Sequence, residues 1–226
     1  MTAQTTLVFE TSTPFASLAL IESGGLSELR SFTSDRSHNA VLFGPLAELL
    51  HGRESAEIER VLVGSGPGSY SGTRVGIAAA QGVAMAAGCP AVAIPSILGV
   101  AAAEKGAGCL AIGDARRGSF WTAHIQDHHL AGDPELTDAS GLAAVVARAL
   151  AAGIPVFSFE NPERFPLAPE LGREVRHEYP SADLLWRAWQ AAGPAARQRW
   201  CDERPQPIYL KPPHITPAKR SWLTPG

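Results

Sequence analysis

Apolar and polar residues alternate over short stretches in the first part of the chain. The runs Thr6–Thr11, Phe15–Ile21 and Leu26–Phe32 are rich in apolar and β-favouring residues and are separated by turn residues. They predict three consecutive antiparallel strands. Two further apolar runs, Val61–Val63 and Ala91–Ile94, predict short buried strands later in the chain.

Between these strands the apolar residues take helical spacing and length. The segments concerned are His38–His51, Thr73–Ala87 and Pro95–Glu104, and Pro45 inside the first predicts a kink. The resulting order is β-β-β-α-β-α-β-α. This order predicts a mixed sheet flanked by helices.

The opening pattern then recurs in the second half of the chain. Leu110–Asp114 is an apolar run that ends in an acidic residue, as the first strand ends near Glu10, and Ser119–Ile125 alternates like a strand. A duplicated plan explains both halves economically. We therefore predict a first lobe over residues 1–104 and a second, smaller lobe over residues 105–226.

The rest of the second half is less regular. Gly141–Ala152 and Ala182–Ala192 predict helices, and Ile154–Phe157 predicts a strand. Asn161–Tyr179 is rich in Pro, Arg and Glu, so we expect irregular structure there. The tail Pro205–Gly226 is Pro-rich and predicts an extension that its apolar residues anchor near Ile208.

A glycine-rich loop separates the fourth predicted strand from the helix that follows it. Its glycines are Gly64, Gly66, Gly68 and Gly72, and its spacing fits neither a P-loop nor a dinucleotide fingerprint. A structural turn is favoured, with a positive φ expected at Gly68. The alternative is an anion site at the start of the helix.

The two helices on either side of the fourth strand are almost free of charge. Small residues recur every three or four positions from Gly72 to Ala87, a spacing that lets another helix approach closely. One interpretation is a core helix of this chain. The other is that one helix face belongs to a second subunit.

Composition excludes some functional classes. The 226 residues have a formal net charge of -3, which gives no electrostatic footprint for nucleic acid. Three cysteines without metal spacing, and no basic leader before an apolar core, favour a cytoplasmic protein. Val75–Ala103 is uncharged, but its glycines and prolines favour burial in protein over a membrane span.

Four motifs together resemble the TsaB family, also called YeaZ. They are L-V-F-E-T-S-T-P-F-A-S-L-A-L (Leu7–Leu20), G-S-G-P-G-S-Y-S-G-T-R-V-G-I (Gly64–Ile77), G-D-A-R-R-G (Gly113–Gly118) and P-I-Y-L-K (Pro207–Lys211). The resemblance covers most of the chain. It implies an α/β, two-lobed actin-like ATPase (ASKHA) fold with a reduced second lobe.

The resemblance also implies a function. TsaB proteins are subunits of the bacterial apparatus for N6-threonylcarbamoyladenosine at position 37 of tRNA, are regarded as non-catalytic, and bind the catalytic subunit TsaD. The pair of TsaB and TsaD also binds the ATPase TsaE, and tRNA is bound by the assembled complex. We expect no cofactor on this chain alone, with ATP and Mg²⁺ in the assembled complex. Homodimers through the same surface are an alternative state.

By helix face, the resemblance also implies a partner interface. Its positions in this chain are His38, Leu42, Leu46, Arg74, Gly76, Ala79, Ala80 and Val83. The chain departs from the family pattern at Glu10, where Asp is usual, and at Thr73 and Gln81. The change at Glu10 argues against a first strand that still positions a metal or nucleotide.

The residues themselves offer little catalytic chemistry. His38 and His51 are separated by a spacing that places them on different faces of a helix, so they predict no metal site. Glu10 and Asp114 end equivalent strands and are expected to form a vestigial cleft. The alternative function is an ATP-dependent phosphotransferase or hydrolase that uses these two acids.

Overall fold

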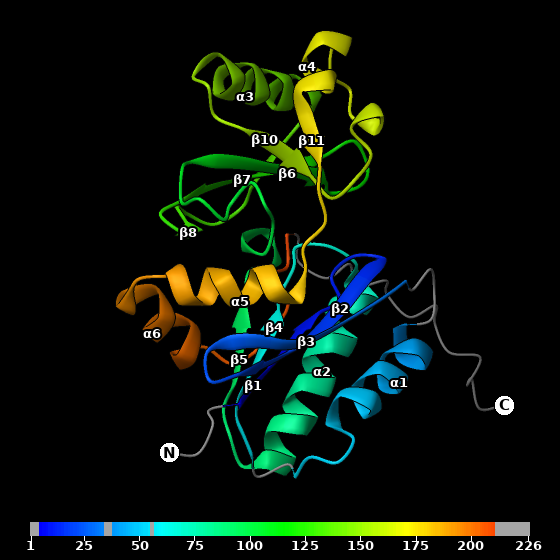
Figure 1. The fold of residues 1–226 in the computed structure, drawn as a ribbon. Helices are drawn as coiled ribbons and strands as arrows, with labels where there is room; N and C mark the ends of the chain where they lie inside the picture. Colours follow the sequence, from blue (N-terminus) through cyan, green and yellow to red (C-terminus); the bar gives the residue numbers. More distant parts are fainter. Residues whose placement is uncertain (1–4, 34–37, 55–56, 211–226) are drawn as a thin grey trace, which may run out of the picture.

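The first lobe is built on a five-stranded mixed sheet in the order β3-β2-β1-β4-β5, with β1, β4 and β5 parallel and β2 and β3 antiparallel to their neighbours. The structure is a computed structural model that describes residues 5–33, 38–54 and 57–210 (Figure 1). The strands are β1 (Thr5–Glu10), β2 (Phe15–Glu22), β3 (Gly25–Thr33), β4 (Ile58–Gly64) and β5 (Ala91–Ile94).

Helices cover this sheet on both faces. Leu7 and Phe9 of β1 pack on one face with α1 (His38–Leu50) and α2 (Tyr70–Ala87). Val8, between them, packs on the opposite face with α5 (Ala182–Ala191) and α6 (Pro194–Asp202). Successive side chains of a strand point to opposite faces, so every residue of β1 is buried.

The second lobe repeats the plan on a smaller scale. Its sheet has the order β11-β10-β6-β7-β8, and β9 also pairs with β7. Its elements are β6 (Cys109–Asp114), β7 (Phe120–Gln126), β8 (His129–Leu130), β9 (Glu135–Thr137), α3 (Ala139–Ala151), β10 (Val156–Ser158), α4 (Pro169–Glu174) and β11 (Val175–His177). The predicted α/β fold, with two mixed sheets that are each flanked by helices, is therefore confirmed.

Two local predictions were wrong, and one helix was missed. Pro95–Glu104 is not a helix: a single 3₁₀ turn, η2 (Ser96–Leu98), is followed by turns. The stretch 161–179 is not irregular, because it contains the 3₁₀ turn η3 (Pro162–Arg164), α4 and β11. The helix α6 was not predicted at all. Each of these elements is short, and short elements carry too few residues to show a period.

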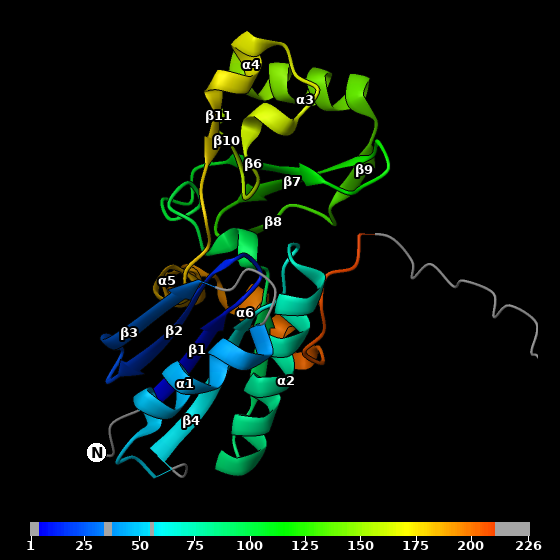
Figure 2. The ribbon, with the colours of Figure 1, turned by 90° about the vertical axis from the view of Figure 1, so that its right-hand side faces the viewer.

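The chain returns to the first lobe after the second lobe is complete. The interpretation placed residues 105–226 in the second lobe, but α5 contacts β1 and β2, and α6 contacts β5. The backbone N–H of Ala182 donates to Ser17 Oγ at 2.9 Å, and that of Ser181 donates to the Gly99 carbonyl at 3.0 Å. Two views at right angles show α5 between the second lobe and the first sheet (Figures 1 and 2).

The last described residues lie along the first lobe. Ile208 N donates to the Ser65 carbonyl at 2.9 Å, and Leu210 packs against the shared core. The remainder of the predicted tail, residues 211–226, lies outside the described residues, as does Lys211 of the P-I-Y-L-K motif. No helix in the described part of the chain combines the length and apolar character that crossing a bilayer requires.

The Ser17 hydroxyl is expected to hold the start of α5 against β2. Ser17→Ala removes the acceptor of the buried Ala182 N–H, which should cost about 1–3 kcal/mol of unfolding free energy. Chemical denaturation measures this loss. The matched control is Ser31→Ala on the exposed strand position opposite Ser17, which should change stability by less than about 0.5 kcal/mol. Equal effects of the two changes would contradict the expectation.

Candidate functional site

The glycine loop packs against the turn between β1 and β2. Ser69 N donates to the Ser12 carbonyl at 2.6 Å, and Ser69 Oγ caps α2 by accepting from Gly72 N at 3.2 Å. Gly66 N donates to Ser96 Oγ at 2.9 Å. These three N–H groups are satisfied by protein acceptors rather than left for a bound anion. The arrangement favours the structural interpretation of the loop.

The glycines of this loop are explained mainly by other atoms that lie close to their Cα atoms, and less by the backbone conformations that only glycine adopts easily. The positive φ is at Gly66 (84°), so the expectation of a positive φ at Gly68 was wrong. A Cβ at Gly68 would lie 2.3 Å from the Ser12 carbonyl oxygen, and one at Gly64 would lie 2.0 Å from Glu10 Oε2. Only a residue without a side chain fits at either position.

Glu10 is buried completely at the end of β1. Its Oε1 accepts from Ser12 N at 2.7 Å, whereas among the described residues neither its Oε2 nor the buried hydroxyl of Ser12 has a hydrogen-bond partner. Burial raises the pKa of Glu10, and the neighbouring groups of Ser12 and Ser96 lower it by less. Burial of this carboxyl therefore disfavours the ionised form that metal or phosphate chemistry requires.

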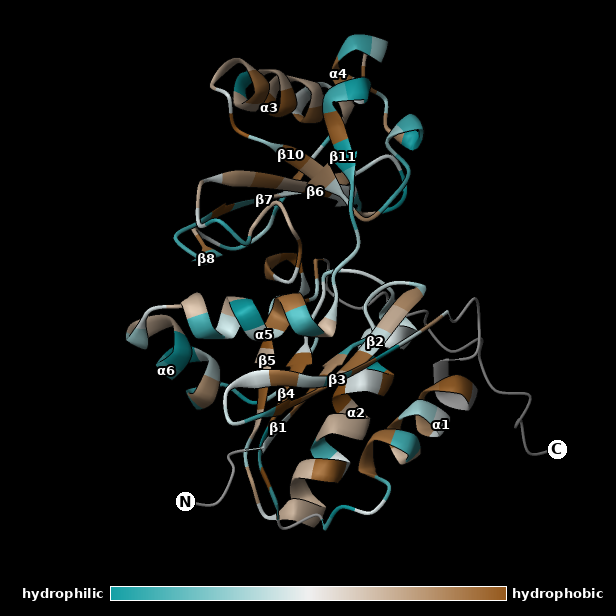
Figure 3. Ribbon diagram, in the orientation of Figure 1, coloured by the Kyte–Doolittle hydropathy of each residue, from teal (hydrophilic) through white to brown (hydrophobic). Residues whose placement is uncertain are grey.

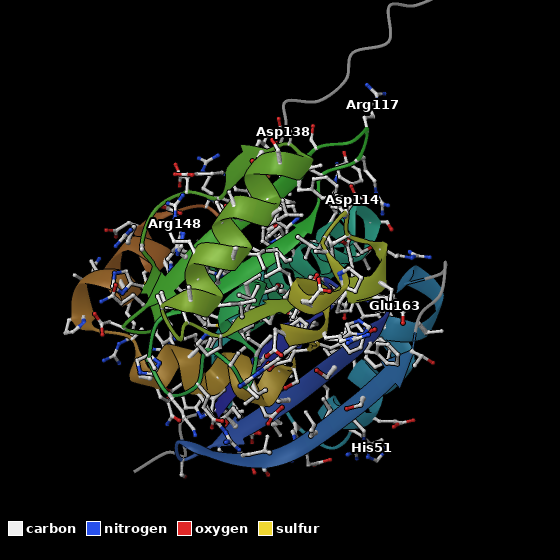
Figure 4. The ribbon with its side chains drawn as sticks, turned by 90° about the horizontal axis from the view of Figure 1, so that it is seen from above. His51, Asp114, Arg117, Asp138, Arg148 and Glu163 are labelled. Atoms are coloured by element: carbon white, nitrogen blue, oxygen red, sulfur yellow. The ribbon has the colours of Figure 1, made fainter. Side chains whose placement is uncertain are left out.

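Asp114, the second acid of the predicted cleft, has its own local partners. Its Oδ1 accepts from Arg116 N at 2.6 Å, and its backbone N–H donates to Glu160 Oε2 at 2.8 Å. Burial raises the pKa of Glu160. Figure 4 shows Asp114 and Arg117 near the same turn, with Arg117 pointing away from the protein. Within the described parts of the chain, no hydrogen bond or ion pair links Glu10 to Asp114.

Metal chemistry has no assembled ligand set in the described residues. No group of three or more His, Cys, Asp or Glu side chains there is placed to hold an ion. His51 follows α1 and is exposed (Figure 4).

The predicted interface positions divide between core and surface. Leu42, Leu46, Gly76 and Ala80 are buried in the core between α1, α2 and the first sheet, so they offer no surface to a partner in this conformation. Ala79 and Val83 are partly buried and Arg74 is exposed. His38 begins α1, and its side chain is outside the described residues.

The exposed face of these helices is formed by other residues. On α2 it includes Ala78, Gln81 and Met85, the last with 84% of its side chain exposed, and on α1 it includes Phe43. Figure 3 shows both helices mostly in the colours of apolar residues, and Figure 2 shows them side by side. The buried residues of α1 and α2 recur at helical spacing along one face of each helix. Met85 and Phe43 lie off that face, and this position was the signal in the sequence that could have found them. We call this face the α1/α2 surface.

A cavity of about 720 Å³ lies where the lobes meet, and Tyr209 is among its lining residues. Ser65 and Pro95 line it from the first sheet, and residues 129–134 line it from the second lobe. Its charged lining side chains are Asp133, Arg199, Glu203 and Arg204. These two acids and two bases cancel in formal charge, so the cavity has no net preference for an anion or a cation.

Residues 33–169 match the family model described as TsaD, tRNA N6-adenosine threonylcarbamoyltransferase, which is more than half of the chain. The chain belongs to the TsaD family. Within this family its named relatives are TsaB and YeaZ proteins, so the assignment that the motifs predicted is confirmed.

Two curated relatives carry the name "tRNA threonylcarbamoyladenosine biosynthesis protein TsaB". The Haemophilus influenzae protein is 32% identical over 101 residues, which are 44% of this chain and 42% of that protein. The Escherichia coli protein is 29% identical over 140 residues, which are 59% of this chain and 60% of that protein. The chain thus spans about half the length of the curated relatives that it matches.

Two solved structures share the fold over nearly the whole chain. One is a Pseudomonas aeruginosa protein described as similar to peptidase YeaZ, with a TM-score of 0.69 and 25% identity. The other is YeaZ from Pseudomonas aeruginosa, with a TM-score of 0.64 and 24% identity. Each match covers 92% of this chain and 100% of the solved chain.

The glycine loop gives a sharp stability test for this TsaD-family chain. Gly68→Ala should destabilise the fold by about 1–3 kcal/mol, because the new Cβ meets the Ser12 carbonyl. Thermal unfolding measures it, together with Gly82→Ala as the control. Gly82 lies exposed in α2 with no atom near its Cβ position, so alanine there should stabilise by about 0.5–1 kcal/mol. A neutral Gly68→Ala would contradict the close packing.

The raised pKa of Glu10 predicts a pH-dependent stability. A raised folded pKa stabilises the fold only while the carboxyl is protonated, so wild-type stability should fall as pH rises above the ordinary value of 4.5. Glu10→Gln keeps an oxygen acceptor for Ser12 N and cannot ionise. The variant should therefore gain stability relative to wild type as pH rises from 4.5 to 8. Parallel pH profiles of the two proteins, measured by urea unfolding, would contradict this.

Proposed function

We propose that this chain is a non-catalytic subunit of the apparatus that makes N6-threonylcarbamoyladenosine in tRNA. Its curated relatives are named for this biosynthesis, and the matching family model is named for the transferase itself. In this proposal the chain binds and orients a TsaD-type catalytic subunit. ATP and Mg²⁺ bind mainly to other subunits. A TsaE-type ATPase joins the pair, and tRNA is bound by the assembled complex.

The observation that carries the proposal is the α1/α2 surface. Met85 and Phe43 are exposed large apolar side chains on neighbouring helices, and small residues such as Ala78 and Gly82 lie beside Met85 along α2. Apolar, charge-poor surfaces of this kind are characteristic of the centres of protein–protein interfaces. A second chain of similar fold has equivalent helices to offer, so a helix-on-helix contact suits both a TsaD-type partner and a competing homodimer.

The state of Glu10 supports a non-catalytic role. The alternative, a phosphotransferase or hydrolase that uses Glu10 and Asp114, requires both carboxylates to be ionised and to reach one reacting group. Glu10 is instead completely buried, and this burial raises its pKa, while Asp114 is bonded to its own loop. Magnesium-dependent nucleotide turnover by the purified chain, lost in Asp114→Ala, would favour this alternative.

The test is complex formation with the TsaD-type subunit of the same cell, measured by size-exclusion chromatography with light scattering and by calorimetry. Met85→Glu places an unpaired charge in the centre of the α1/α2 surface and should weaken the complex by at least about 30-fold. The fold should be intact, because this side chain packs against little of its own chain.

Leu136→Glu is the matched control. Leu136 is also an exposed apolar residue, but it lies on β9 of the second lobe, so its variant should bind like wild type. A wild-type chain that forms no complex would refute the proposal. Equal effects of the two variants on binding would refute the assignment of the α1/α2 surface as the binding surface. A stable homodimer alone would point to a self-associating relative.

A further inference from the structure

Three exposed side chains stack at the end of the α1/α2 surface where α2 begins. The rings of Tyr209 and Tyr70 have centroids 6.3 Å apart, and the guanidinium carbon of Arg74 lies 5.1 Å from the centroid of the Tyr70 ring. Arg74 Nη1 also donates to Tyr70 Oη at 2.5 Å. Tyr70 is 63% exposed and Tyr209 54% exposed, so the stack presents its outer faces to solvent. We call it the tyrosine–arginine stack.

The stack joins two distant parts of the sequence. Tyr70 and Arg74 come from α2, whereas Tyr209 comes from the segment after α6. That segment is fixed on both sides of Tyr209, because Ile208 N donates to the Ser65 carbonyl and Leu210 packs on the shared core. Tyr209 is therefore held beside α2 although more than half of its surface is exposed. Rigid tyrosines lose little conformational entropy when a partner covers them.

Arg74 brings a charge that no carboxylate in the described part of the chain neutralises. No described carboxylate lies within ion-pair distance of it, whereas Glu48 of α1 lies 3.6 Å from Arg30 and Arg53 bridges Glu22 and Glu28. Arg74 is the only charged residue of α2 and sits near its N-terminal, positive end. The α1/α2 surface is thus apolar along its length and positive at one end.

We propose that the tyrosine–arginine stack is the specificity-determining end of the partner surface, and that it receives an aspartate or glutamate of the partner. This inference rests on the proposed function, since the partner is the same TsaD-type chain. A carboxylate can accept from Arg74 and be flanked by the rings of Tyr70 and Tyr209, which shield it from water. Charge-assisted bonds in such a setting are stronger than exposed ones, and Tyr and Arg are the residues that most often dominate interfaces.

The stack also separates the right partner from a second copy of this chain. In a symmetric homodimer whose contacts bring the two α2 N-termini together, Arg74 would face its own positive counterpart, whereas a partner with an acid at that place gains an ion pair. Like charges brought together disfavour the wrong pairing, which is how many interfaces achieve specificity.

The experiment compares Arg74→Glu and Tyr209→Ala with wild type in calorimetric titrations with the TsaD-type partner at low and high salt. Both variants should weaken binding by at least about tenfold, and the loss in Arg74→Glu should shrink at high salt because the lost attraction is electrostatic. Arg148→Glu, which reverses an exposed charge on α3 of the second lobe, is the control and should bind like wild type. Far-UV circular dichroism and melting curves verify the fold of each variant.

A charge swap identifies the recognised group. Each surface Asp and Glu of the partner is changed to Lys and paired with Arg74→Glu, and one such change should restore most of the lost affinity. Failure of every swap would overturn the carboxylate assignment.

The remaining outcomes separate this inference from the proposed function. If the wild-type chain binds the partner and the Arg74→Glu and Tyr209→Ala variants bind it with the same affinity, the role of the stack is refuted and the proposed function stands. If the wild-type chain does not bind the partner, the proposed function itself is refuted. If the variants leave the protein complex intact and weaken only its binding to tRNA, the stack recognises phosphate and the inference is wrong.

Discussion

The burial of β1 on both faces is the constraint on which the structure depends. A strand covered on two sides needs two layers of helices, and here they come from different parts of the chain: α1 and α2 follow within the first lobe, whereas α5 and α6 arrive only after the second lobe. The second sheet adds Ala111, Trp121 and Phe157 to the same core as α5. The two lobes therefore share one hydrophobic core, and the layer between them belongs to both.

This arrangement explains why, of the two helical layers on the first sheet, the α1/α2 layer is the one available to another protein. The helices α5 and α6 have the second lobe above them, so their apolar side chains are already used within the chain. The layer formed by α1 and α2 has the sheet on one side and solvent on the other. Its outward face can be apolar without harming the core, because only the inward face of these helices packs against the sheet.

The sequence predicted the parts of this fold that depend on local chemistry. Short runs of apolar and β-favouring residues predicted β1 to β3, and the crowded glycines predicted the turn before α2, since both signals act within a few residues. The inward and outward faces of α2 could not be separated in the same way. Gly76 and Met85 both lie in a helix of small and apolar residues, and only the position of Thr11 and the sheet decides that Gly76 is buried and Met85 is not.

The remaining failures have the same origin. The helix α6 has a weak apolar pattern because only Ala196 and Trp200 are buried, so tertiary packing, and not periodicity, holds it against β5. The stack of Tyr209 on Tyr70 unites residues that are distant in sequence, and no spacing rule connects them. The cleft between Glu10 and Asp114, predicted from equivalent strand ends, stays a prediction, and the sequence did not show that the buried Glu10 carboxyl occupies the space that a side chain at Gly64 would fill.

The late return of α5 and α6 also has a consequence for biosynthesis. While the ribosome is still adding the second lobe, one face of the first sheet, with Val8 and Ile21, has no cover from its own chain. That face closes only when residues 182–202 have left the exit tunnel and docked. The first lobe cannot mature as an independent unit during translation. The nascent chain must carry an exposed apolar sheet until synthesis is almost complete, and this interval is when it most needs chaperone protection.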